Sequence, residues 1–239
     1  MHKVDSKMEA GEPPSGEIIE RMGELIGESV KSGVCLDGAG LHRSARRVRL
    51  RTRGKEKATE HGPYSGDNEL VASMAMIKAR SMDEASELAQ RFAAAAGHVD
   101  VEIGPVVEAW DLGVMPKPKS EYERYLLLLK GNARTESGES PSAEERAATA
   151  ALAEELARTG ALLKRVALAS SSKGKRLASA PKNERRWIDG PFSESKELIA
   201  GFAILELPGI DEAIAWAERY VAILGDVEVD VRLLMSEAT

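Results

Sequence analysis

The chain has 239 residues, of which 43% are hydrophobic, 30% charged and 4% aromatic, and its formal net charge is −6. No stretch approaches the roughly 18–20 uncharged apolar residues of a membrane-spanning helix, and the first residues lack the apolar core of a secretory signal. The single cysteine, Cys35, excludes an intramolecular disulfide framework and a multi-cysteine metal site. These features predict a cytoplasmic protein without a membrane partner.

The first half of the chain alternates between the apolar patterns of strands and helices. Its opening strand is short, at most residues 2–4, because only about a dozen residues precede the first helical pattern. Ser81 and Glu84 predict a capping box at the start of the second helix. The other predicted elements are a helix at 18–30, a strand at 34–41, a hairpin at 46–59, and strands at 70–79 and 99–107.

A segment with two prolines and a glycine, residues 111–120, predicts a linker between two halves. The second half begins with the apolar run Leu126–Leu129, which is typical of a strand buried on both faces. Ser140 and Pro141 indicate the start of a helix that Gly160 ends. The remaining predictions are a strand at 161–169, a polar hairpin at 173–188, a strand at 199–207, a helix at 211–220 and a strand at 227–233.

The chain repeats itself at a period of 128 residues. Residues 61–106 and 189–234 share 16 identities over 46 ungapped positions. This period is far too long for a solenoid, so it indicates a duplicated domain. The predicted domains are residues 1–110, with a truncated opening strand, and residues 121–239, joined by the linker 111–120.

Each half has the element order β-α-β-hairpin-β-α-β, which is typical of a ferredoxin-like unit. A lone unit leaves one face of its antiparallel sheet uncovered, and two units can bury those faces against each other. The predicted fold class is therefore α+β, with two tandem ferredoxin-like units forming an intramolecular pseudo-dimer of the dimeric α+β barrel type.

The segment Asp189-Gly190-Pro191-Phe192, with the Lys-Glu and Gly-Phe residues that follow it, resembles the signature of the YCII-related family in its DGPF-type branch. The first half matches in part, with His61-Gly62-Pro63-Tyr64 at the equivalent place, and Leu41-His42-Arg43-Ser44 resembles the family's Leu-His-Pro-Ser segment. The resemblance implies a dimeric ferredoxin-like α+β barrel. For most of the family no reaction is established, and some members of the wider family resemble small lyases or dehydrochlorinases that use a His/Asp pair.

Three residues are candidates for catalysis: His61, Asp189 and His42. His61 takes the place of Asp189 in the other repeat, so a pseudo-twofold axis could bring the two together as a His–Asp pair. His42 follows a predicted strand and could line a pocket with Ser44. The alternative for Asp189 is a structural one, because Asp-Gly-Pro is also typical of a turn.

Two basic hairpins concentrate 14 of the 33 lysines and arginines of this acidic chain. Arg47 and Arg49 alternate with apolar residues and therefore share one strand face. That face is either solvated beside acidic helices or directed at an anionic ligand or partner. Nucleic acid is disfavoured, because the net charge is negative and no aromatic residues are interleaved. The predicted ligand-binding residues are Ser44, Tyr64, Ser65, Ser193, Lys196, Arg47 and Arg49.

Neither a metal site nor a cofactor is predicted, since no histidines have metal-ligand spacing and no phosphate-binding glycine loop occurs. Three functions stay open: a module that binds a small molecule in a cavity between the halves, a lyase-type enzyme with a His/Asp pair, and a protein-interaction module that uses the basic hairpins. The expected ligand is a small anionic or aromatic molecule, and the expected state is a monomeric pseudo-dimer or a homodimer.

Overall fold

The computed structural model describes residues 1–53, 56–66, 69–97, 99–179, 185–192, 198–225 and 227–235. Its elements up to the linker are β1 (His2–Lys3), α1 (Ser6–Ala10), α2 (Gly16–Lys31), β2 (Cys35–Leu41), η1 (Ser44–Arg46), β3 (Val48–Arg53), β4 (Glu56–His61), β5 (Val71–Ala79), α3 (Met82–Ala95) and β6 (Val101–Val107). After the linker come β7 (Glu123–Lys130), α4 (Ala133–Glu136), α5 (Ala143–Arg158), β8 (Leu162–Ala167), η2 (Ser171–Lys173), β9 (Lys175–Ser179), β10 (Arg185–Asp189), β11 (Ile199–Leu205), α6 (Ile210–Leu224) and β12 (Val229–Val231).

The helix starts follow ordinary capping chemistry, with two corrections to the sequence-based expectation. Ser81 caps α3 by accepting from the Glu84 N–H, but the Glu84 carboxylate accepts from Arg80 and not from Ser81, so no capping box forms. Helix α5 begins after the predicted start at Ser140 and Pro141, because its N-cap is Ser142, which forms a capping box with Glu145.

The twelve strands of the described chain form one continuous path of ten strands, with β3 and β4 branching from it at β6. One sheet has the order β12-β1-β11-β2, and β9 and β10 extend it beyond β12. The other has the order β6-β7-β5-β8, and β3 and β4 extend it beyond β6. Each core of four strands has the antiparallel 4-1-3-2 order of a ferredoxin-like unit.

Both sheets take strands from both sides of the linker. The sheet β6-β7-β5-β8 is built from one continuous stretch of chain, residues 71–167, whereas the other sheet combines the N-terminal strands β1 and β2 with the C-terminal strands β11 and β12. The boundaries of the sheets are therefore offset by half a repeat from the sequence repeat. The division at residues 111–120 remains a prediction about the sequence repeats.

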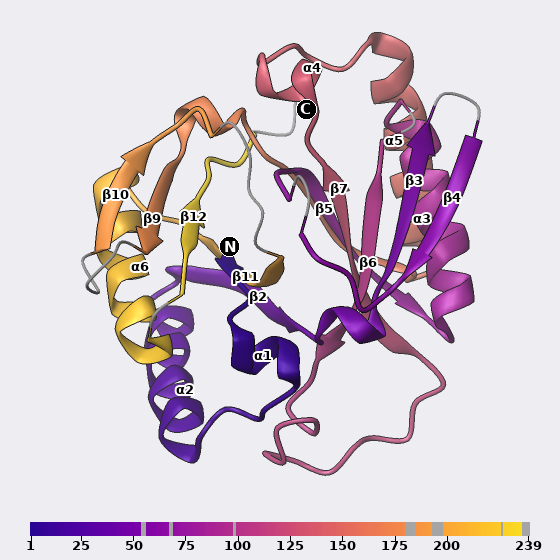
Figure 1. Ribbon diagram of the computed structural model, residues 1–239. Helices are drawn as coiled ribbons and strands as arrows, with labels where there is room; N and C mark the ends of the chain where they lie inside the picture. Colours follow the sequence, from indigo (N-terminus) through magenta and orange to yellow (C-terminus); the bar gives the residue numbers. More distant parts are fainter. Residues whose placement is uncertain are drawn as a thin grey trace.

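Two helix pairs cover the outer faces of the sheets (Figure 1): α3 and α5 pack on one sheet, α2 and α6 on the other. Under α3 and α5 lies a core that includes Ile77, Phe92 and Leu127. A second core lies beneath α6, with Leu177, Val221 and Val229.

The faces opposite the helices meet in a central core. It contains Met74, Leu126 and Leu128 from one sheet and Ile199 and Phe202 from the other. Alternate residues of β7 thus point to different cores, as the period of two in a strand requires.

Two seams join the sheets. Strand β2 pairs with β6 through Gly40↔Val107 and Leu41↔Val106, and the chain after β8 bridges the chain after β12 through Leu168↔Leu234. No helix in the described part of the chain has the length and apolar character needed to cross a membrane.

Candidate functional site

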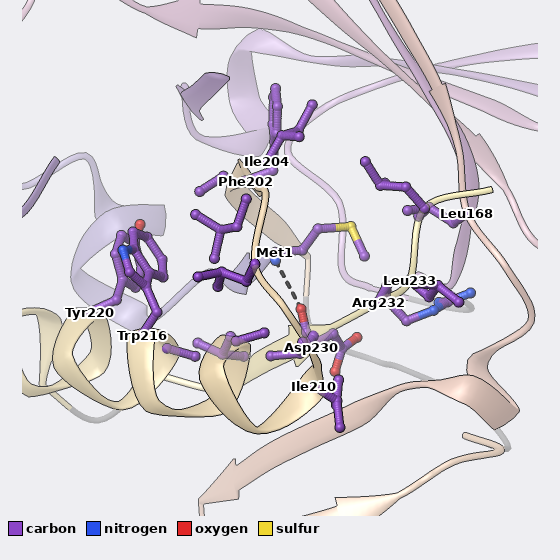
Figure 2. Close-up of a pocket in the computed structure, with 18 of the residues that line it drawn as sticks. Met1, Leu168, Phe202, Ile204, Ile210, Trp216, Tyr220, Asp230, Arg232 and Leu233 are labelled. Carbon is purple, nitrogen blue, oxygen red and sulfur yellow. Dashed lines mark hydrogen bonds between the residues drawn. The ribbon is translucent and has the colours of Figure 1, made fainter. Parts of the chain in front are cut away.

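A cavity of about 420 Å³ opens beside the short strand β1 (Figure 2). Its walls are β11, β12 and α6, with Met74 and Leu168 contributed by the other sheet. Most of the lining side chains are apolar or aromatic, and the volume falls within the range of ligand sites. The buried members include Phe202, Ile204 and Trp216.

The cavity continues the line of β1, at places that β7 fills in the other sheet. The sheet β6-β7-β5-β8 is called the first sheet below, and the sheet β12-β1-β11-β2 the second. In the first sheet, β7 pairs with β5 from Val71↔Lys130 to Ala79↔Glu123. In the second sheet, β1 makes the corresponding pairs only at Lys3↔Ile199 and His2↔Gly201, after which Met1 exchanges backbone hydrogen bonds with Asp230.

Matching the residue pairs of β1 with those of β7 shows which strand positions are empty in the second sheet. Lys3, His2 and Met1 correspond to residues 130, 129 and 128, so no described residue takes the places of 123–127 in the second sheet. Residues 203–205 and 231–233, which would flank those places, all line the cavity. At about 3.4 Å per residue, the empty path of five residues is about 17 Å long.

Arg232 is the strongest polar feature of the lining. Its side chain is 2% exposed, and its Nη2 donates to the Ala169 carbonyl at 2.6 Å and contacts Glu136 at 3.5 Å. Its Nε and Nη1 have no hydrogen-bond partner among the described residues. Burial lowers the pKa of this guanidinium despite the nearby Glu136 carboxylate. Buried donors without partners cost free energy, so they favour an acceptor in the cavity.

An exchange of arginine and glycine places equivalent guanidinium groups in the two sheets. Arg47 lies over Gly104 in one sheet, where a Cβ on Gly104 would meet the Arg47 side chain at 3.4 Å. Arg232 lies over Gly174 in the other, where a Cβ would meet its Cδ at 3.0 Å. Arg47 donates to the His42 carbonyl, and Arg232 donates to the Ala169 carbonyl 127 residues later. The arginine therefore reaches the same place from opposite strands.

One wall of the cavity carries three hydrogen-bonded aromatic side chains, those of His2, Trp216 and Tyr220. The Tyr220 hydroxyl and His2 Nδ1 are 2.9 Å apart, and Trp216 stacks on Tyr220 while donating to the Ser29 hydroxyl at 2.9 Å. Burial lowers the pKa of His2 to about 3, with the N-terminal amine and Arg47 adding to the effect. His2 is thus a neutral imidazole at physiological pH.

At the floor of the cavity, the Asp230 carboxylate is paired with two cationic side chains. Asp230, 2% exposed, lies 3.1 Å from Lys3 Nζ and accepts from Arg176 at 2.6 and 3.0 Å. Burial alone would raise the pKa of Asp230, but these two cations outweigh it and lower the pKa to about 2. Among the described lining residues, Arg232 is therefore the buried cation whose donors lack partners.

The predicted ligand residues Arg47 and Arg49 belong to a second buried ionic group, in the other sheet. Their guanidinium groups contact the carboxylate of Glu102 at 2.9 and 2.8 Å, Arg49 also contacts Glu69, and Lys130 contacts both acids. The expectation of a solvated arginine face is wrong for this hairpin, because Arg47 and Arg49 are 1% and 2% exposed. Burial would raise the pKa of Glu102, but Lys130, Arg47 and Arg49 lower it well below its usual range.

The Gly-Pro-aromatic motifs pack against the two 3₁₀ turns. The Ser44 hydroxyl accepts from the Tyr64 N–H, and the Ser171 hydroxyl accepts from the Phe192 N–H. A Cβ on Gly62 or Gly190 would lie 1.8 Å from a carbonyl oxygen of these turns, which explains both glycines. Arg49 lies 4.1 Å over the ring of Tyr64, and an equivalent arginine lies 4.2 Å over Phe192. Ser44 and Tyr64 are therefore brought together with Arg49.

The structure does not bring His61 and Asp189 together. They end the outer strands β4 and β10, which lie on opposite sides of the molecule (Figure 1). Asp189 has a side chain that is 75% exposed and paired with Lys175. His61 is exposed and lines a separate pocket of about 300 Å³ with Arg46 and Arg47.

His42 has an acidic neighbour, Asp111, that the sequence did not indicate. Its Nε2 lies 3.2 Å from Asp111 Oδ2, and Arg46 Nη1 lies within 3.1 Å of both ring nitrogens. Burial and Arg46 lower the pKa of His42, although Asp111 opposes them. Ser65 is exposed, and Ser193 and Lys196 lie outside the described residues.

Comparison with known proteins adds one finding. Residues 124–231 match the YCII-related domain. This stretch runs from β7 to β12. No curated protein and no solved structure matches the chain.

Sequence reasoning missed Arg232 and the buried acids Glu102 and Asp230. The two acids do leave a signal, because each interrupts a valine-rich strand at the same place in the 128-residue repeat. Arg232 leaves none, since its counterpart at that spacing is Gly104. Within the described ranges, no group of three or more His, Cys, Asp or Glu side chains could hold a metal ion.

Proposed function

We propose that the protein is a small-molecule-binding module derived from a tandem duplication of a DGPF-type YCII-related unit. The contacts that recur 127 or 128 residues apart support the duplication, and the two seams around a central core support the dimeric α+β barrel arrangement. The match of residues 124–231 supports the family of the second half.

The ligand site of this proposal is the cavity beside β1, and the ligand is an apolar molecule with one anionic group. The observation that carries it is the buried Arg232, whose Nε and Nη1 donors have no partner among the described residues and border a cavity lined mostly by apolar side chains. The cavity reaches the other half of the molecule through Met74 and Leu168. A carboxylate would satisfy the open donors in a charge-assisted hydrogen bond, while the alkyl or aromatic body contacts the apolar walls.

The test compares decanoate with decanol by their effect on the unfolding temperature and on tryptophan fluorescence. A ligand that binds only the folded protein raises its stability, so we expect a higher midpoint with decanoate. Arg232→Gln should weaken decanoate binding about tenfold to a hundredfold, the worth of a hydrogen bond to a charged group, and change decanol binding little.

Two further variants locate the site. Ala213→Trp places an indole in the cavity lining and should abolish binding of both compounds. Arg219→Gln removes an exposed arginine that pairs with Glu28 and should leave binding unchanged. Wild-type affinity in both Arg232→Gln and Ala213→Trp would refute the proposed site.

A lyase-type activity is a second candidate, supported by the His42–Asp111 pair. The lowered pKa leaves His42 unprotonated near neutral pH, as a general base requires. Chloride release from a panel of small chlorinated acids would report such an elimination, and His42→Gln should abolish it. Equal release by the wild type and the variant would refute this role of His42.

A further inference from the structure

The cavity has the shape and the walls of a strand position, and this indicates the class of ligand that it takes. Its two walls are β11 and the segment 231–233, which begins at the last residue of β12 and continues beyond it, and they flank the empty places on either side. Any occupant of a strand position meets backbone N–H and C=O groups along both walls, and such groups need partners when they are buried. An alkyl chain offers none, whereas an extended peptide offers one donor and one acceptor at each residue.

The other half of the molecule contains a peptide in the equivalent position. There β7 lies between β5 and β6 and pairs with both, through Met76↔Leu126 on one side and Gly104↔Leu126 on the other. Its Tyr125 and Leu127 face the helices, and its Leu126 faces the central core. This strand shows what fills the position when it is occupied.

Charge complementarity specifies one side chain of the occupant. The place of Gly104, opposite Leu126 in the first sheet, is taken by Arg232 in the second. The other charges in the lining and next to Arg232 have partners or are exposed: Asp230 is held by Lys3 and Arg176, and Glu136 contacts only Nη2 of Arg232. The N-terminal amine of Met1 donates to the Asp230 carbonyl, and Lys173 is exposed. An acidic side chain opposite Arg232 would form a cross-strand ion pair with its open donors.

We infer that the cavity binds a short extended peptide, antiparallel to β11 and β12, with an acidic residue between two apolar ones. This inference rests on the proposed function and names the ligand class of the same site. The apolar residues take the places of Tyr125 and Leu127 against Ala213, Trp216 and Ala217, and the acidic residue takes the place of Leu126. Recognition by strand addition is a common mode of peptide binding.

The experiment uses three capped pentapeptides and the intact protein. The first, acetyl-Glu-Arg-Tyr-Glu-Leu-amide, copies residues 123–127 with glutamate in the fourth place. The second carries lysine in that place. The third is the first peptide with backbone N-methyl groups on alternate residues, which removes donors without removing side chains. Affinity is measured by calorimetry, and decanoate serves as a competitor.

We expect the first peptide to bind at least tenfold more tightly than either of the others. Arg232→Gln should remove the preference over the lysine peptide and leave the effect of N-methylation. Equal binding of the N-methylated peptide would overturn strand pairing, and equal binding of the lysine peptide would overturn the role of Arg232. If decanoate binds and no peptide binds or displaces it, the inference fails while the proposed function stands; if nothing binds, both fail.

A fused version of the peptide guards against poor solubility. The residues Glu-Arg-Tyr-Glu-Leu placed directly ahead of Met1 would continue β1 along the empty path. This fusion should raise the unfolding temperature and abolish binding of the free peptide. A fusion with Gly-Ser-Gly-Ser-Gly is the control, and equal unfolding temperatures for the two fusions would overturn the inference.

Discussion

At the scale of single residues, the interior of this protein contains an unusual amount of matched charge. Lys3 and Arg176 hold Asp230 in one sheet, and Lys130 and Arg49 hold Glu102 in the other. Removing one member of such a group leaves an unpaired buried charge, which is more costly than the pair is stabilising. The arginines could be assigned to one strand face from the sequence, but not to the inner face, because their acidic partners are distant in the chain and the alternation does not say which face is buried.

His2 makes the stability depend on pH. Its pKa is lowered by burial to about 3 in the folded state, while an unfolded histidine titrates near 6.5. The unfolded chain therefore binds the extra proton first as the pH falls, and stability is lost below about pH 6.5. Between pH 7 and pH 5 the loss is about 2 kcal/mol.

Urea unfolding at pH 7 and pH 5 measures this effect. His2→Gln is neutral at both values and can still bond to Tyr220, so its free energy of unfolding should change by about 2 kcal/mol less than that of the wild type. His61→Gln, at an exposed position, serves as the control and should retain the wild-type change. A wild-type pH dependence in His2→Gln would contradict the assignment.

At the scale of elements, strands and long helices were predictable from their periodicity, and short elements were not. The predicted opening strand at residues 2–4 is confirmed as β1. Helices α1 and α4 have five and four residues, too few for a periodic pattern, and depend on caps at Asp5 and Asn132. The cavity could not be predicted, because it arises from the difference in length between β1 and β7 after both are placed in sheets.

The exchange of arginine and glycine between paired strands gives an element-scale prediction. Arg47→Gly removes a partner of Glu102, which should cost about 3–5 kcal/mol. Gly104→Arg adds a Cβ 3.0 Å from Leu41 Cδ2 and crowds Arg47, which should cost about 1–3 kcal/mol.

The double variant recreates in the first sheet the arrangement of the second. Its guanidinium can reach the place that Arg47 vacates, so its loss of stability should be smaller than the sum of the single losses by about 1–3 kcal/mol. Urea unfolding of the four proteins at neutral pH measures this coupling. Strictly additive losses would show that the two arrangements are not equivalent.

At the scale of the whole molecule, the repeat was visible in the sequence but the sheet partners were not. Either half could complete the strand order 4-1-3-2 by itself, so identical patterns are compatible with separate or combined sheets. Only the pairing of β7 with β5 and β6 shows that each sheet uses strands from both halves. The candidate pair His61 and Asp189 depended on the wrong relative placement of the two hairpins.

The continuous sheet predicts the behaviour of a fragment. Residues 43–169 contain β3 to β8 with α3 and α5, and therefore a complete sheet with its helices. We expect this fragment to unfold cooperatively and to self-associate, because Met74, Met76 and Leu126 lose their cover from the other sheet.

Light scattering after size exclusion would measure the association. Met76→Lys in the fragment should shift it toward the monomer by placing a charge on the exposed face. A fragment that stays monomeric without this substitution, or that shows no cooperative transition, would contradict the independence of this sheet.

The offset between repeat and sheet also has a consequence for biosynthesis. The sheet of residues 71–167 is complete once the chain has been made to residue 169, but the N-terminal segment with α2 and β2 has only the two residue pairs with β6 until β11, α6 and β12 emerge. At translation rates of 5–20 residues per second, the last 70 residues take roughly 4–14 s. During that interval the first-made segment is held to the folded neighbour only by the short β2–β6 seam, so the end of the chain that is synthesised first is the last to complete its sheet.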